Sequence, residues 1–292
     1  MTFPADAGVL LVAHGTVENL DDLEAFVARI RHGRPPPPGL VAELRHRYEA
    51  IGGSSPLLQT TREQAQALAK RLEAPVLVAM RLWEPGVDQA LVGAAALGLR
   101  RLVVIALAPF SQHVYWDAAQ KVAVAAKTTL QLLPSAPYAE EPDFVAAHVR
   151  AIQQHAPPDA AIVLSAHSLP EVAIQRGDPY ARLVEASAAA VSAGLGRPVR
   201  LCYQSQGADG GAWLGPTVRE TLSALAAEGR REVVWAPFGF LADHVETLYD
   251  LDIEARAIAT ELSLSLIRVP ALNLNPGLTS ALGAVAIRSI SA

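Results

Sequence analysis

A histidine and a row of carboxylates give the strongest chemical signal in the sequence. His167 lies in the segment SAHSLPE directly after a predicted strand, and Glu246 lies in FLADHVETLYDLDIEAR after another. On a helix, Glu246, Asp250 and Glu254 share one face because they are spaced four residues apart. Hard divalent cations prefer oxygen ligands, and a histidine accepts a proton near neutral pH. His167 and Glu246 could therefore act as base and acid or as two metal ligands. A solvated acidic face is the alternative reading of the row.

A second group of residues, in the N-terminal half, suits an anionic ligand. The segment RHRYEAIGGSSPL brings Arg47, Tyr48 and Ser55 close together in sequence. Arginine, serine hydroxyls and exposed backbone N–H groups bind carboxylates or phosphates. The paired glycines equally fit the end of one helix and the start of the next. The chain has 21 arginines and only three lysines, which makes any single arginine less informative. The sequence contains neither a P-loop nor a GxGxxG pattern, so a nucleotide site has no support.

Short β-rich runs alternate with helical patterns along the whole chain. Most of these runs are apolar throughout, as expected for strands covered on both faces. The predicted strands are Val9–Ala13, Val76–Met80, Leu102–Leu107, Thr129–Leu133, Ala161–Ser165, Arg200–Tyr203, Glu232–Ala236 and Ser265–Val269. The predicted helices between them include Leu57–Leu72, Asp143–His155, Leu183–Ala193 and Thr217–Ala227. This alternation predicts parallel sheets with right-handed crossovers and a ligand beyond the carboxyl ends of the strands.

The chain divides most naturally into two halves. The proline-rich segment Pro134–Pro142 follows the fourth strand, and the strand–helix alternation starts again after the next helix. We expect two Rossmann-like α/β domains, each with a four-stranded parallel sheet flanked by helices. Residues 1–142, completed by a C-terminal helix over 275–292, would form the first domain and residues 143–274 the second. Four consecutive prolines within Arg31–Gly39 fit either a stiff spacer or a rigid lip of a binding site.

Composition excludes several classes of protein. With 51% hydrophobic and 18% charged residues among 292, the chain is too apolar for a disordered protein. No stretch reaches the roughly 20 apolar residues of a membrane helix, and we expect no signal peptide. A net charge of −5 argues against a nucleic-acid surface. Cys202 is the single cysteine, which excludes an intrachain disulfide and a cluster held by several cysteines of one chain. We expect a cytoplasmic protein.

Taken together, these motifs resemble the ferrochelatase family, and most closely the monofunctional bacterial coproporphyrin III ferrochelatases. The matching segments span Val9 to about Glu254 in family order, nearly the whole chain. They are VLLVAHGT, RIRHGRP, RYEAIGGSSPLLQTT, EEPDFV, LSAHSLPE, RGDPY, YQS, WLGP and FGFLADHVETLYDLDIEA. The resemblance implies a lyase that inserts Fe²⁺ into a porphyrin late in haem synthesis. It also implies two Rossmann-like domains of the class II chelatase type, with the porphyrin between them.

The resemblance also assigns roles to individual residues. His167 matches the family's metal-site histidine and Glu246 its partner carboxylate, while Asp250 and Glu254 match a proposed metal route. The positions expected to contact the porphyrin and its propionates are Arg31, Arg47, Tyr48 and Ser55. A family tyrosine is matched loosely by Tyr115 or by Trp116, and Leu82 stands where some relatives have a histidine. No tightly bound cofactor and no iron–sulfur cluster are expected.

His14 departs from the family pattern. It falls where the coproporphyrin branch usually carries a tyrosine, on the opposite side of the ring from His167. Imidazole is a good iron ligand, so His14 could ligate iron in the product complex. Alternatively, His14 only forms a hydrogen bond within its turn.

Other readings of function stay open. A sirohydrochlorin-type cobalt or iron chelatase shares the fold and an AHGT-like start. A haem-binding or haem-delivery protein without activity is a second alternative, although the presence of both His167 and Glu246 argues against it. Coproporphyrin III is favoured over protoporphyrin IX, from which it differs in carrying four propionates rather than two. We expect a monomer whose partners are the porphyrin and Fe²⁺.

Overall fold

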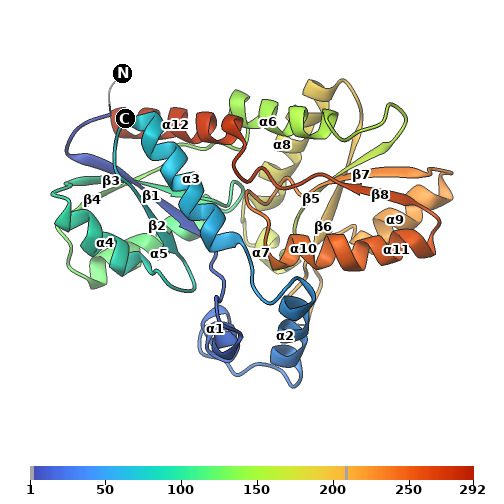
Figure 1. Cartoon of the computed structure of the whole chain (residues 1–292), viewed down its shortest axis with the longest axis horizontal. Helices are drawn as coiled ribbons and strands as arrows, with labels where there is room; N and C mark the ends of the chain where they lie inside the picture. Colours follow the sequence, from blue (N-terminus) through green and yellow to red (C-terminus); the bar gives the residue numbers. More distant parts are fainter. Residues whose placement is uncertain (1–2, 208–209) are drawn as a thin grey trace.

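Two parallel sheets form the framework of the molecule (Figure 1). A computed structural model describes residues 3–207 and 210–292. The strand orders are β2-β1-β3-β4 and β6-β5-β7-β8, and all neighbouring strands are parallel. The strands are β1 (Ala7–Ala13), β2 (Val76–Met80), β3 (Arg101–Ala106), β4 (Gln131–Pro134), β5 (Ala161–His167), β6 (Val199–Gln204), β7 (Glu232–Ala236) and β8 (Ser265–Arg268). All eight overlap the predicted strands, so the predicted fold class is confirmed.

Helices cover both faces of each sheet. In chain order they are α1 (Leu23–Ile30), α2 (Leu40–Ala50), α3 (Leu57–Leu72), α4 (Val87–Ala96), α5 (Gln112–Ala125), α6 (Pro142–Gln153), α7 (Glu171–Gln175), α8 (Tyr180–Leu195), α9 (Val218–Ala227), α10 (Val245–Leu248), α11 (Arg256–Glu261) and α12 (Pro276–Ser291). A short 3₁₀ turn, η1 (Leu20–Asp22), precedes α1, and a π-helical segment, η2 (Asp250–Ala255), connects α10 to α11.

Strand β1 shows why the central strands are apolar throughout. Every one of its residues is buried, and successive side chains point to opposite faces of the sheet. Val9 and Leu11 lie in the core formed with α3 and α12, whereas Leu10 and Val12 lie in the core formed with α4 and α5. A polar side chain would be buried on either face, so the polar groups gather at the carboxyl end of the strand.

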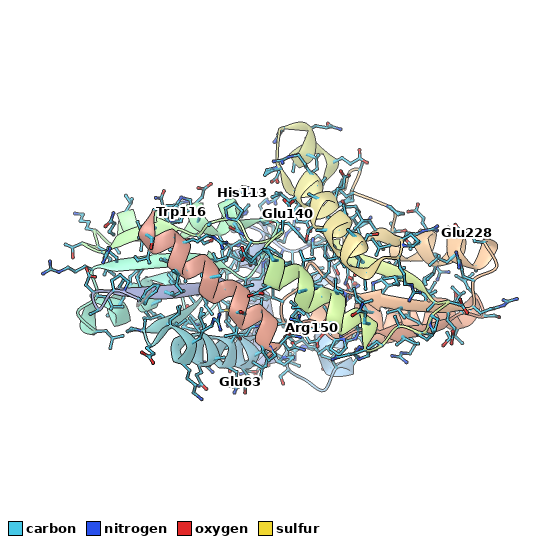
Figure 2. All side chains as sticks on the ribbon, turned by 90° about the horizontal axis from the view of Figure 1, so that it is seen from above. Glu63, His113, Trp116, Glu140, Arg150 and Glu228 are labelled. Carbon is cyan, nitrogen blue, oxygen red and sulfur yellow. The ribbon has the colours of Figure 1, made fainter. Side chains whose placement is uncertain are left out.

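The two sheets are joined by helices rather than by shared strands. α12 packs against α3, β3 and α6, and α6 also packs against α8 of the second half (Figure 2). Leu278, Leu282 and Val285 of α12 belong to the same core as Val9 and Leu11. The proposed boundary between residues 142 and 143 falls in the first turn of α6 and stays a prediction.

The segment between β1 and α3 stands apart from both sheets. Figure 1 shows α1 and α2 projecting below the two sheets, connected by the stretch that contains the four prolines. α1 and α2 enclose a small core of their own with Val17, Leu23, Phe26 and Tyr48. The alternatives of spacer and rigid lip for the prolines stay open.

Candidate active site

His167 is the last residue of β5, at the carboxyl end of a central strand. Its Nδ1 lies 2.5 Å from the carbonyl oxygen of Ser168, which can only accept a hydrogen bond, so Nδ1 carries a proton. Its Nε2 lies 3.7 Å from Oε2 of Glu246. The hydroxyl of Tyr180 donates to the backbone carbonyl of His167 at 2.7 Å. The ring is therefore held with Nε2 directed toward the carboxylate.

Glu246 lies in α10 between two histidines. His244 Nε2 is 3.6 Å from Glu246 Oε2, close to the distance to His167. Burial raises the pKa of the Glu246 carboxyl, but the positive charges that His167 and His244 carry when protonated outweigh burial and lower the pKa to about 2. Glu246 is therefore a carboxylate at any physiological pH. His244 is a site residue not predicted from the sequence, although it stands two residues before Glu246 in the same motif.

A buried hydrogen-bond chain fixes the backbone of Glu246. The side-chain amide of Gln204, at the end of β6, donates to the Glu246 carbonyl at 3.0 Å. Ser165 donates to the Gln204 side-chain oxygen at 2.6 Å, and the Trp235 indole donates to Ser165 at 2.8 Å. Each link comes from a different strand of the second sheet, so the position of Glu246 depends on the whole sheet rather than on α10 alone.

His14 brings the first sheet to the same site. It follows β1, and its Nδ1 lies 3.4 Å from the hydroxyl of Tyr115 on α5. Burial and the neighbouring guanidinium of Arg81 lower the pKa of His14 to about 4, while the carboxylate of Glu246 acts in the opposite direction. His14 is therefore a neutral imidazole. The mutual influence of His14 and Glu246 shows that the carboxyl ends of the two sheets meet here.

Tyr115 and Trp116, the two loose matches to a family tyrosine, lie in different surroundings. Tyr115 reaches His14, and the Arg81 guanidinium lies 5.1 Å above its ring. Trp116 instead lines a separate cavity of about 520 Å³ together with His113 and Glu140, which Figure 2 labels on one side of the molecule. Tyr115 is therefore the member of this pair that lies beside His14, and its contact with a porphyrin stays a prediction.

The carboxylate row does not lie on a regular α-helix. The N–H of Glu254 donates to the carbonyl of Tyr249, five residues earlier, at 3.1 Å, which makes this stretch π-helical. The side chain of Asp250 is 7% exposed and that of Glu254 is 46% exposed, so the row leads outward to the surface. Burial and the charge of Glu246 raise the pKa of Asp250 to about 7. The local widening of the helix was not predicted from the sequence, and the role of the row as a metal route stays a prediction.

Arg47 of α2 contacts this row. Its Nη1 lies 2.9 Å from Oδ1 of Asp250, and its Nη2 lies 3.8 Å from Oε1 of Glu254. The hydroxyl of Ser205 donates to the other oxygen of Asp250 at 2.5 Å. The structure therefore unites an arginine proposed for the porphyrin with two carboxylates proposed for the metal.

The other residues predicted to contact the porphyrin have structural partners. Tyr48 is buried, and its hydroxyl shares a 2.8 Å hydrogen bond with Thr16. Ser55 accepts a hydrogen bond from the N–H of Leu57 at the start of α3, at 3.3 Å. Arg31 donates to the carbonyl of Pro35 at 3.1 Å, within the proline segment. Burial raises the pKa of Tyr48, and the charge of Glu246 adds to this effect, which places Tyr48 near the site. The contacts of Arg31, Tyr48 and Ser55 with a porphyrin stay predictions.

No ready-made metal cage exists in the described part of the chain. Within residues 3–207 and 210–292, no three histidine, cysteine, aspartate or glutamate side chains are close enough together to hold an ion. Cys202 is a buried free thiol in β6, and burial raises its pKa to about 12. Across the same residues, none of the helices combines the length and apolarity needed to cross a bilayer.

Comparisons with known proteins identify the family of this chain. A family model named Ferrochelatase matches residues 6–290. The chain belongs to the ferrochelatase family. It is therefore a metal chelatase, a lyase that inserts Fe²⁺ into a porphyrin.

Relatives match over nearly their full length. A ferrochelatase from Herpetosiphon aurantiacus is 36% identical over 96% of this chain and 98% of its own. The coproporphyrin III ferrochelatase of Geobacillus kaustophilus is 36% identical over 97% and 95%. The solved structure of the sirohydrochlorin chelatase SirB from Bacillus subtilis subspecies spizizenii, in complex with cobalt, gives a TM-score of 0.61 over 98% of this chain and 96% of its own. At 15% identity that likeness shows a shared fold.

Proposed function

We propose that this chain inserts Fe²⁺ into coproporphyrin III and that His167 and Glu246 act at the metal. The observation that carries the proposal is the 3.7 Å approach of His167 Nε2 to Glu246 Oε2, at the point where the ends of both sheets meet. The name of the Geobacillus kaustophilus relative supports coproporphyrin III as the substrate.

In this proposal His167 receives protons from the porphyrin. Insertion releases two protons from the pyrrole nitrogens for each Fe²⁺ that enters. With Nδ1 donating to Ser168, the free lone pair of His167 is on Nε2, which faces the site. The permanent charge of Glu246 stabilises the imidazolium that forms and can also bind Fe²⁺. Asp250 and Glu254 then provide a path for the ion from the surface.

The porphyrin would be bound between the two sheets. Arg31, Arg47 and Ser55 would hold its propionates, and this binding energy could support bending of the ring, which exposes the nitrogen lone pairs to the metal. His14 would ligate the product iron from the face opposite His167. The low pKa of His14 supports this role, because a neutral imidazole has a lone pair for iron.

An anaerobic competition assay tests the proposal. With Fe²⁺ and equal amounts of coproporphyrin III and protoporphyrin IX, we expect coproporphyrin to be consumed at least tenfold faster. We expect His167→Ala and Glu246→Gln to lower turnover by roughly 10²–10⁴, the usual contribution of a positioned acid or base. Near wild-type turnover in both variants would refute the site assignment, and faster use of protoporphyrin would refute the substrate.

Two other outcomes would favour a different function. Preference for sirohydrochlorin with Co²⁺ or Fe²⁺ would indicate the sirohydrochlorin-type chelatase that shares this fold. Tight haem binding without any single-turnover insertion would indicate a haem-binding protein. We further propose a cytoplasmic monomer without a resident cofactor. The buried lone thiol of Cys202 supports the cytoplasmic location, and light scattering of the purified chain tests the monomer.

A further inference from the structure

Arg47 has an unusual concentration of negative partners. Besides Asp250 and Glu254, its Nη2 lies 2.8 Å from Oε1 of Glu43, and its guanidinium lies 5.0 Å from the ring centre of Tyr249. The Arg47 side chain is 24% exposed. These partners come from α2 and from the α10–η2 segment of the second half, so Arg47 is a single cation shared by carboxylates of two elements.

The guanidinium occupies the carboxylates that a metal ion would need. Oδ1 of Asp250 accepts from Arg47, and Oδ2 accepts from Ser205. A divalent cation at Asp250 or Glu254 would stand beside a permanent positive charge and would have to displace it. While Arg47 stays in place, both oxygens of Asp250 are therefore occupied, and an ion at Glu254 is opposed by the charge of the guanidinium.

We propose that Arg47 is a displaceable counter-cation that keeps Fe²⁺ off Asp250 and Glu254 until a porphyrin carboxylate draws the guanidinium away. This inference rests on the proposed function of the site. A propionate is a carboxylate like those that Arg47 already binds, and it competes for the same fork of N–H donors. The exchange requires only rotation of one long side chain. Porphyrin binding and metal entry are thereby coupled, and the porphyrin binds first.

Metal binding to the full chain, measured without turnover, tests the first half of the proposal. The probe is Mn²⁺, followed by the electron paramagnetic resonance signal of the free ion at pH 8. We expect Arg47→Met to bind Mn²⁺ at least about tenfold more tightly than the wild type, within the usual range of coupling between sites. We expect Arg47→Lys, which keeps the positive charge, to bind as weakly as the wild type. Equal or weaker Mn²⁺ binding by Arg47→Met overturns the proposal.

Arg29→Met is the matched control. Arg29 also combines an ion pair, 3.1 Å to Glu84, with a position 4.6 Å from the ring centre of Trp83, but it does not contact the carboxylate row. We expect this variant to leave Mn²⁺ binding unchanged. Adding Asp250→Asn to Arg47→Met should abolish the gain in affinity. A gain of the same size in Arg29→Met, or one that survives Asp250→Asn, contradicts the assigned role.

The second half of the proposal is tested with zinc coproporphyrin III, which has the propionates but cannot take up another metal. We expect it to tighten Mn²⁺ binding to the wild type and to have no further effect on Arg47→Met. If zinc coproporphyrin binds but leaves the wild-type affinity for Mn²⁺ unchanged, the coupling is refuted. If it does not bind, the proposed substrate is wrong, while the comparison of Mn²⁺ binding by Arg47 variants without porphyrin still tests the counter-cation.

Discussion

At the scale of single residues, His148 is a buried histidine that takes no part in the proposed chemistry. It lies in α6 with its ring 4.7 Å from that of Phe144, and its Nε2 has no hydrogen-bond partner within residues 3–207 and 210–292. Burial lowers its pKa to about 3, against about 6.5 in an unfolded chain. Below pH 6.5 the His148 imidazole is protonated in the unfolded chain, whereas in the folded chain it stays neutral down to about pH 3. The free energy of unfolding must therefore fall with pH across this range.

We predict that His148→Leu weakens the pH dependence of stability. One such group changes the free energy of unfolding by at most about 1.4 kcal/mol per pH unit. Between pH 7 and pH 5, urea unfolding should show the wild type losing roughly 2 kcal/mol more than the variant. The control is His32→Asn, because His32 is exposed and Asn tolerates its positive φ. Parallel curves for the wild type and His148→Leu would contradict the prediction.

His14 gives a second prediction at this scale. If its neutral imidazole ligates the product iron, His14→Ala should change the absorption spectrum of the bound ferric coproporphyrin, because the axial ligand sets the electronic state of the iron. Tyr115→Phe removes only the hydroxyl 3.4 Å from His14 Nδ1 and should cause a smaller shift. Identical spectra for the wild type and His14→Ala would show that His14 serves only the turn.

At the scale of elements, the sequence predicted what depends on local pattern. Apolar runs such as Val9–Ala13 identify buried strands because both faces of each sheet are covered. The sequence could not predict that Arg47 would meet Asp250, 203 residues away, because that pairing depends on how α2 projects toward η2. Nor does any residue type predict the π-helical segment, whose hydrogen bonds include the one from the Glu254 N–H to the Tyr249 carbonyl. His244 could have been found from its place beside Glu246.

The loop after β7 packs closely against the end of β5, where His167 lies. Gly239 packs against β5, and a Cβ there would lie 2.9 Å from both Cα and Cβ of Ala166, which precedes His167. Gly239→Ala should therefore push the end of β5 away from α10 and cost about 1–3 kcal/mol of stability. A displacement of His167 by about 1 Å can lower turnover by about 10²-fold. Urea unfolding and iron insertion measure the two effects.

Gly93→Ala is the matched control for this substitution. Gly93 lies in α4, and a Cβ there would meet only Cδ2 of Leu77, at 3.3 Å, the end of a flexible side chain. Alanine is favoured over glycine within a helix by about 1 kcal/mol, so this variant should be as stable as the wild type or more stable, with full activity. Equal activity in Gly239→Ala and Gly93→Ala would show that the end of β5 does not depend on this close contact.

At the scale of the whole molecule, the two halves share one core. Leu241, from the loop after β7, lies in the same buried cluster as Val9 of β1 and Phe144 of α6. Gln64 of α3 strengthens this junction, because its side-chain amide donates to the carbonyls of Leu241 and Asn273, each at 2.9 Å. The halves are therefore joined by buried apolar surface and by hydrogen bonds shielded from water, and we expect them to unfold together.

Gln64→Leu tests this junction. The half-buried Asn273 carbonyl loses the side-chain amide of Gln64, and an unsatisfied polar group costs up to about 1–3 kcal/mol when it is fully buried. The loss is partly offset because Gln64 Oε1 is itself buried without a hydrogen-bond partner among the described residues. We expect the variant to lose about 1 kcal/mol of stability in urea, with tryptophan fluorescence and far-ultraviolet circular dichroism still giving coincident transitions. Trp83 reports on the first half and the buried Trp235 on the second, so separate transitions would appear in the fluorescence.

Gln66→Leu, at an exposed position of the same helix, is the control and should stay within about 0.5 kcal/mol of the wild type. Two separate transitions in the wild type would show that the shared core does not couple the halves, and equal stability of the Gln64 and Gln66 variants would show that Gln64 does not join them.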